Sequence, residues 1–546
     1  MATTAPQDRE GDGTPGAAPR RGQDQDAADT ARTAGRGGVA VLGAKVFFIV
    51  VGFIQQPLLK LVVGLADFGG LAQALVVSNT VNNVVVASAT QGVSRAVAGA
   101  PGREEQVLRV ALRVHVPLAL GIALLTALAA PLYASFEGAS DVVPPLLVLA
   151  GVALFYGLYA PLVGYINGRK RFTTQAGLDV TFAALRTIGL VGVGYLFVKR
   201  GQSGVLGTTV GWVVAAACIV PLALRATGIG KPREAAAQDR GVPTARAYLW
   251  ILLPIAGVQL CTNLLMQIDI ALLGRFLAHG AHGAIGIIDE ASARRDAVKQ
   301  WVAIYKECQT FAFLPYQLLF SITLVLFPML ARAKAEGDDA AVRNYVVRGS
   351  RLGGIACGLL VGVVVAMPES LLSFAYGRAD AARGADTLRM LALGQASFAM
   401  LGIATTILTS LGRERISALL TLGAVAVVAT SCWALASGAD FGHAQLLRTA
   451  TATAIALSAS IAVAGMVVRA QTGGFVPLLT MLRVGVALGA CIALGFFMPC
   501  VGKLVTPLVA VAVAVAYVAI LVGLREITGE DLGALKAMRG KKRARP

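Results

Sequence analysis

The sequence predicts an all-α polytopic membrane protein with about fourteen transmembrane helices. Of its 546 residues, 56% are hydrophobic and only 14% are charged, and the mean hydropathy is +0.70. A soluble core cannot hide so much apolar surface. Apolar windows of about 20 residues, the length that crosses a bilayer, recur along the chain, and cations cluster in the loops between them.

The net charge of +18 would suggest a nucleic-acid partner in a soluble protein. Here the cations fall in short loops and tails, where they set topology and meet anionic membrane lipid, so we expect no nucleic-acid partner. The sequence contains no phosphate-binding G-x-x-x-x-G-K-[ST] loop, no H-E-x-x-H and no C-x-x-C. These absences argue against a metal site, a cofactor and an enzyme.

The elements follow in order. Residues 1–37 have no apolar run and are predicted to form a disordered cytoplasmic arm. Predicted spans lie near 39–63, 70–93, 108–134, 143–166, 173–197, 205–226, 247–273, 306–331, 350–368, 388–411, 416–437, 446–468, 481–499 and 504–524. The loop 284–301 is predicted to form a short amphipathic helix on the outer surface.

Cations predict the orientation of the chain. They concentrate after every second span and in the tail, at Arg95, Arg103, Arg169, Lys170, Arg171, Arg225, Lys231, Arg233, Arg240, Arg246, Arg332, Lys334, Arg343, Arg348, Arg413, Arg415, Lys536, Arg539, Lys541, Lys542 and Arg543. Cytoplasmic loops carry such an excess, so both termini are expected in the cytoplasm. The opposite loops also hold cations, among them Lys199, Arg294 and Arg378, which argue the other way.

Two loop motifs repeat and predict the domain organisation. Arg95 and Arg332 follow the second and eighth spans and lie 237 residues apart; GRKRF at 168–172 and GRERI at 412–416 lie 244 apart. We therefore expect two parallel six-helix lobes, with two helices appended. The predicted units are a cytoplasmic arm (1–37), an N-terminal lobe (38–226), a cytoplasmic linker (227–246), a C-terminal lobe (247–469), two additional helices (470–525) and a basic cytoplasmic tail (526–546).

Four segments together carry a family resemblance: YKECQTFAFLPYQLLFSITLVLFPMLARA at 305–333, QGVSRAVAG at 91–99, YINGRKRF at 165–172 and PIAGVQLCTNLLMQIDIALLGRF at 254–276. With these segments the chain, over about 38–525, resembles the polysaccharide flippase branch of the multidrug/oligosaccharidyl-lipid/polysaccharide exporter superfamily. The lipid II flippase, multidrug extruder and capsule- or sporulation-type exporter branches stay open.

The resemblance implies a V-shaped two-lobed bundle in the bacterial cytoplasmic (inner) membrane. Such a flippase would move an undecaprenyl-diphosphate-linked oligosaccharide, for instance an O-antigen unit, to the outer leaflet by alternating access. A polysaccharide polymerase would be a partner. Coupling to a proton or sodium gradient is left open.

Ionisable residues inside predicted spans are candidates for function because burying a charge in a membrane is costly. Arg186 lies near the middle of the fifth span, and Asp179 lies seven residues earlier on the same helix face. Asp179 is a candidate for an ion pair with Arg186 or for a coupling site. Lys45 and Lys60 lie in the first span and are candidates for a cationic substrate-binding cavity, with headgroup contact as the alternative because each lies close to an end of the span.

Three further charges surround the loop between the seventh and eighth spans. Arg275 and Lys306 flank this loop, and with Arg186 they are candidates for a cationic cavity that holds a diphosphate. Interface anchoring is the alternative for Lys306. Asp269 is a candidate partner of Arg275 or a site for a coupling proton or sodium ion.

Neutral polar residues and prolines complete the candidates. Gln259, Asn263 and Gln267 recur every four residues, and Asn79, Asn82 and Asn83 lie near the centre of the second span. Both stripes suit a sugar pathway or hydrogen bonds between helices. Pro315 and Pro328, in the eighth span, are candidate hinges for alternating access.

Overall fold

The computed structural model describes residues 43–229, 242–283 and 291–527, which are almost entirely helical. The first helix is Gly43–Val63. The others are α2 (Leu65–Ala98), α3 (Glu104–Glu137), the short η1 (Ser140–Val142), α4 (Val143–Gly168), α5 (Phe172–Lys199), α6 (Gly204–Thr227), α7 (Ala245–Gly283), α8 (Ala291–Ala312), α9 (Leu314–Ala335), α10 (Asp339–Ala366), α11 (Pro368–Tyr376), α12 (Arg378–Ser410), α13 (Glu414–Ala436), α14 (His443–Thr472), α15 (Leu478–Phe497) and α16 (Thr506–Gly523). The predicted arm and most of the predicted linker and tail lie outside the described residues.

Thirteen of the described helices are long and apolar enough to cross a membrane, which makes the chain a multi-pass membrane protein. The span predicted at 306–331 is instead divided between α8 and α9. The division falls at Phe313, and Pro315 occupies the first turn of α9, where its missing N–H costs no helical hydrogen bond. Pro328 lies in the second half of α9.

The helix predicted on the outer surface at 284–301 forms, in its described part, the start of the longer helix α8, and of residues 291–301 only Val298 is buried. α8 packs against α2 and α12. Its Val298, Val302 and Tyr305 are buried, and all three belong to the core of the second bundle. Four residues separate Val298 from Val302, so these apolar positions line one helix face that the neighbouring helices cover. The apolar positions of α8 therefore face neighbouring helices of the protein.

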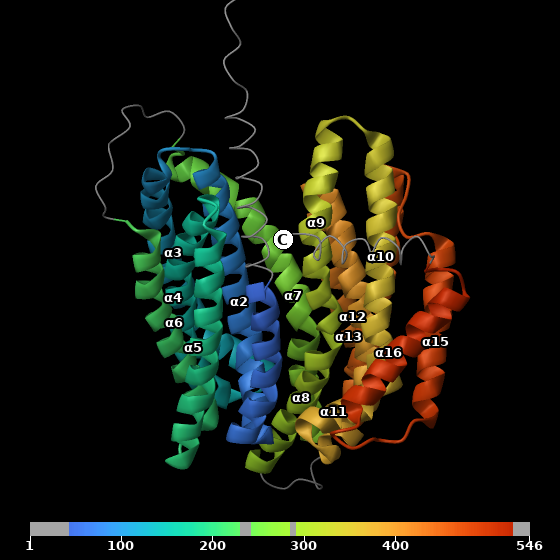
Figure 1. Cartoon of the computed structure of the whole chain (residues 1–546). Coiled ribbons are helices and arrows are strands. Elements are labelled where there is room, and N and C mark those ends of the chain that lie inside the picture. Colours follow the sequence, from blue (N-terminus) through green and yellow to red (C-terminus); the bar gives the residue numbers. More distant parts are fainter. Residues whose placement is uncertain (1–42, 230–241, 284–290, 528–546) are drawn as a thin grey trace, which may run out of the picture.

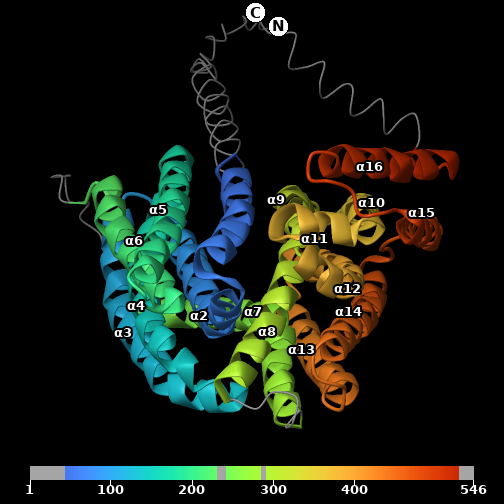
Figure 2. The same ribbon diagram turned by 90° about the horizontal axis from the view of Figure 1, so that it is seen from below.

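Two helix bundles lie side by side (Figure 1). The first helix and α2–α6 form one, and α9–α14 form most of the other; one apolar core of the second bundle also includes Ala72 and Val76 of α2. α15 and α16 pack on α10 (Figure 2). The assignment of six helices to each lobe stays a prediction.

Small residues allow the closest helix contacts. α5 and α6 approach each other at Gly189 and Gly211, where a Cβ on either residue would overlap the other's carbonyl oxygen. Lipid gives helices no hydrophobic reason to associate, so close backbone approach and van der Waals packing hold such pairs together.

α7 belongs to both bundles. Near its start, Tyr248 and Leu252 are buried in the core of the first bundle, and the Tyr248 hydroxyl lies 2.8 Å from His115 Nε2 on α3. Near its end, the carbonyl of Phe276 accepts a hydrogen bond of 2.9 Å from Gln445 on α14. Pro254 lies between these two parts.

The bundles meet at the end that carries α11 and the start of α8, called here the α11 end (the lower end in Figure 1). There Gly69 of α2 lies against the backbone of Lys299 on α8. The ribbons spread apart toward the opposite end, where α9 meets α10 (Figure 1). Contacts between α2 and α8, and between α3 and α7, join the bundles at the α11 end.

Candidate functional site

Arg186 belongs to α5 and lies within the first bundle, where it contacts the first helix and α6. Its Nη2 is 3.4 Å from the side-chain oxygen of Gln55, and its guanidinium lies over the rings of Phe48 and Trp212 at 5.0 and 5.9 Å. Its Nε is buried without a hydrogen-bond acceptor. No carboxylate pairs with Arg186 among the described residues, so this buried cation has capacity for an anionic ligand.

The ion pair predicted between Asp179 and Arg186 is not formed. The Asp179 Oδ2 lies 3.8 Å from Lys45 Nζ, whose side chain is 47% exposed. Lys45 on the first helix is thus the cation that faces Asp179 on α5, although this carboxylate oxygen has no hydrogen-bond partner, and Arg186 is left to neutral partners. Thr187 donates to Gln55, the same oxygen that faces Arg186.

Lys60 joins the first helix to the second bundle. Its Nζ lies 2.7 Å from Glu307 Oε1 on α8, forms an ion pair with Asp380 on α12, and donates to the carbonyl of Tyr376 at 2.9 Å. The Lys60 side chain is 13% exposed. The amine is therefore held by protein carboxylates inside the molecule, and the expectation that Lys60 extends to lipid headgroups is wrong. We call Lys60, Glu307 and Asp380 the Lys60 network.

Asp269 and Lys306 lie near each other in the second bundle, where α7 meets α8. Asp269 accepts hydrogen bonds from the Tyr305 hydroxyl at 2.7 Å and from Gln309 Nε2 at 3.2 Å. Lys306 donates to the other end of the Gln309 side chain at 3.3 Å. Asp269 is buried and its hydrogen-bond donors are neutral. The nearby cation Lys306 is connected to it only through the Gln309 side chain.

Arg275 does not form the ion pair with Asp269 that the sequence offers as one alternative. Its guanidinium donates to the carbonyl of Phe136 at 3.1 Å and lies over the rings of Phe136 and Trp433. Phe136 belongs to α3 and Trp433 to α13, so Arg275 connects the bundles at the α11 end. Among the described residues no contact joins Arg186, Arg275 and Lys306 to one another.

The two polar stripes meet between α2 and α7. Asn83 donates to the side chain of Asn263 at 2.9 Å, and Asn263 donates in turn to the carbonyl of Gln259. Gln267 is buried and Asn79 is half-buried. Asn82 bonds Ser78 on its own helix instead. The Asn83–Asn263 contact therefore lines the boundary between the bundles with neutral polar groups.

Sequence reasoning did not single out Glu307, Asp380, Tyr305 or Gln309. A signal was present for Glu307, because a second charge follows Lys306 directly in a stretch that continues into an apolar run. Asp380 gave no comparable signal, since it lies among the charges of RADAARGAD at the start of α12. Its role depends on a contact with a residue 320 positions away.

Comparison with known proteins identifies this arrangement. The model of a family described as polysaccharide biosynthesis protein matches residues 34–334, more than half of the chain. No curated protein sequence matches significantly.

Solved structures share the fold at low sequence identity. The structure titled lipid II flippase MurJ, inward closed conformation, is similar with a TM-score of 0.67 at 11% identity, over 90% of this chain and 99% of that one. An inward-facing multidrug resistance MATE family transporter of the MOP superfamily gives 0.60 at 13% identity, over 79% and 98%. A MOP superfamily transporter from Pyrococcus furiosus gives 0.55 at 12%, over 79% and 96%.

Proposed function

The chain belongs to the polysaccharide biosynthesis protein family, and from this premise we propose that it is a flippase for a lipid-linked oligosaccharide. The substrate would be an undecaprenyl-diphosphate-linked glycan, moved from the cytoplasmic to the outer leaflet of a bacterial cytoplasmic membrane for surface polysaccharide synthesis. Its fold, which is also that of a lipid II flippase and of MATE transporters, supports a transport role.

One observation carries the substrate assignment. Arg186 is an intramembrane cation with neutral partners and an unsatisfied Nε. An isolated buried charge is costly, and an anion that arrives with its own charge removes that cost. A diphosphate supplies oxygens that a guanidinium binds in bidentate fashion. The neutral side-chain amides of Asn83 and Asn263, beside the main-chain carbonyl of Gln259, suit the hydroxyl groups of sugars.

The contacts between the bundles support a specific state of the transport cycle. The cations of the predicted cytoplasmic loops, such as Arg95, Arg169 and Arg332, lie at the end opposite α11. The α11 end is then extracytoplasmic, and the Lys60 network, Arg275 and the Gly69–Lys299 contact close it. We infer an inward-facing state, in which the glycan-lipid enters from the cytoplasmic side.

A deletion strain tests the proposal. We expect lipid-linked oligosaccharide units to accumulate in the cell and surface polysaccharide to fall, as measured by mass spectrometry of extracted lipids. Accumulation of lipid II instead would identify a lipid II flippase. Unchanged surface polysaccharide with no accumulated lipid-linked intermediate would contradict both.

A second candidate function rests on Asp269. This buried carboxylate accepts from three neutral donors, the Tyr305 hydroxyl, the Gln309 amide and the Ile270 backbone N–H, and has no cation in direct contact, which suits a coupling proton or sodium ion in a drug or metabolite antiporter. An antiporter predicts that Asp269→Asn or Asp179→Asn abolishes efflux, while Arg186→Gln retains it. A glycan flippase predicts the reverse dependence for Arg186. Efflux and glycan export measured on the same three variants separate the two functions.

A further inference from the structure

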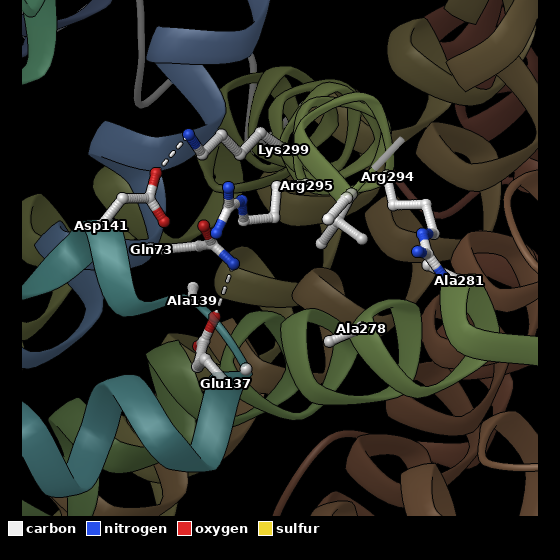
Figure 3. A pocket seen from close by; sticks show the side chains of 12 residues that line it. Gln73, Glu137, Ala139, Asp141, Ala278, Ala281, Arg294, Arg295 and Lys299 are labelled. Carbon is white, nitrogen blue, oxygen red and sulfur yellow. Dashed lines mark hydrogen bonds and ion pairs between the residues drawn. The ribbon is translucent and has the colours of Figure 1, made fainter. Parts of the chain in front are cut away.

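A cavity of about 180 Å³ lies between the two bundles at the α11 end (Figure 3). The first bundle contributes Gln73 of α2, Glu137 at the end of α3, and Asp141. The opposite side is formed by small residues of α7 and by Arg294, Arg295 and Lys299 of α8. A water molecule takes about 30 Å³ of liquid volume, so this cavity has room for a small oxyanion.

The charges of the cavity wall do not cancel. Lys299 forms an ion pair with Asp141, which neutralises both (Figure 3). Arg294 and Arg295 have no carboxylate partner in the described part of the chain, and Glu137 is the remaining anion. Among the described residues of the wall, positive charges therefore exceed negative charges by one, which matches a ligand with a single negative charge.

Gln73 adds a requirement for a hydrogen-bond donor. Its side chain is 1% exposed, and its Nε2 donates to Glu137 at 2.7 Å (Figure 3). That bond fixes the orientation of the amide, because only the nitrogen donates. The amide oxygen is then buried without a donor. An unsatisfied buried carbonyl is unfavourable, so a ligand with a hydroxyl group gains by filling the cavity.

We propose that this cavity binds a phosphate monoanion that carries a hydroxyl donor. Arg294 and Arg295 bind its charged oxygens, and the Gln73 carbonyl accepts a hydrogen bond from its hydroxyl. Dihydrogen phosphate and the headgroup of a phosphoglycerol lipid both have this chemistry. Because both bundles form the wall, the bound anion bridges them and holds the α11 end closed. The site is separate from Arg186 and does not depend on the proposed glycan substrate.

The test uses the purified full-length protein in nanodiscs. In phosphatidylcholine discs, calorimetric titration with inorganic phosphate, with chloride at equal ionic strength as the reference, detects the free anion. In phosphatidylglycerol discs, native mass spectrometry counts retained lipid. We expect saturable binding in at least one arm; the first identifies free phosphate as the ligand, and the second alone identifies the lipid headgroup.

Variants decide whether the binding uses this cavity. Arg294→Gln with Arg295→Gln is expected to weaken binding by about tenfold or more, because charge-assisted hydrogen bonds are lost. Gln73→Leu is expected to weaken it less. Arg200→Gln, an exposed arginine at the same end of the molecule, is the matched control and should bind like the wild type. Both arginines of the double variant are at least partly exposed, so the fold should survive. Absence of binding in both arms, or equal binding by the double variant and the wild type, would overturn the proposal.

Discussion

Arg186 illustrates at the scale of one residue how a charge is kept inside a membrane helix. Its guanidinium lies over two aromatic rings and close to the Gln55 amide oxygen and the Tyr156 hydroxyl, and the carboxylate of its own helix faces Lys45. Aromatic rings stabilise a cation without neutralising it. The charge therefore stays available to a ligand.

We predict that Arg186→Gln reduces glycan export. Hydrogen bonds to charged groups contribute about 1.5–3 kcal/mol, so substrate affinity should fall by about 10- to 100-fold. Lipid-linked intermediates in a complemented deletion strain report the effect. Arg200→Gln, exposed at the end of the same helix, should complement fully. If Arg186→Gln supports wild-type export at equal protein level, Arg186 is structural.

Glu526 provides a second residue-scale prediction, outside the spans. It accepts from Arg351 at 2.7 Å, from Thr480 at 2.7 Å and from Arg483 at 2.9 Å, which ties the end of α16 to α10 and α15. Burial raises the pKa of Glu526, but the hydrogen bonds from Arg351, Thr480 and Arg483 outweigh burial, so its pKa lies below the usual value.

A lowered pKa means that Glu526 stabilises the fold above the pKa of the unfolded chain, about 4.3, and that this stability is lost as pH falls through the folded pKa. Glu526→Gln should lower the free energy of unfolding by on the order of 2 kcal/mol at pH 7 and by less below about pH 4. Thermal unfolding in detergent measures this. The exposed Glu336 serves as the control, and Glu336→Gln should have little effect.

The sequence located individual charges better than their partners. Arg186 and Lys60 stand out because a charge in an apolar run is rare. Their surroundings could not be predicted, since Gln55 lies 131 positions from Arg186 and Asp380 lies 320 from Lys60. Such contacts depend on how the bundles pack, and spacing along one helix gives no information about them.

Helix packing at the scale of elements depends on glycine at the α5–α6 contact. We predict that Gly189→Ala destabilises the protein by about 1–3 kcal/mol, because its Cβ would overlap the Gly211 carbonyl and force the helices apart. Gly192→Ala, on the same helix with open space around its Cα, should be neutral or slightly stabilising. The midpoint of thermal unfolding compares the two. Equal midpoints would show that the helices can separate at little cost.

Element boundaries were predictable where an apolar window stood alone. The first seven predicted spans each overlap one described helix. The eighth did not, because the charges of ARRDAVKQW at 293–301 hide the fact that α8 is already buried on one side. Window hydropathy averages the two sides of a helix, so it missed a segment with one buried face.

The Lys60 network acts at the scale of the whole molecule, because it joins the bundles at the α11 end. We predict that Lys60→Met opens this end, since Glu307 and Asp380 lose the cation that holds them to the first helix. Spin labels at Gln202→Cys and Ser437→Cys, exposed on the two bundles, should report a longer distance by pulsed electron paramagnetic resonance.

The exposed or half-buried native cysteines Cys218, Cys261 and Cys500 are replaced first in that experiment. Lys199→Met, at the end of α5 and exposed, is the matched control. An unchanged distance in Lys60→Met would show that Arg275 and the Gly69–Lys299 contact close the α11 end without the network.

The repeated loop motifs predicted two units, but they did not predict that α7 is shared between the bundles. Each end of α7 is packed in a different bundle, so both ends move when the bundles rock against each other. The stretch of α7 between them then has to bend. Pro254 lies in that stretch and lacks the N–H that would stiffen the helix. The hydrogen bonds His115–Tyr248 and Gln445–Phe276 then anchor the two ends of α7, and their strength sets how much rotation passes from one bundle to the other.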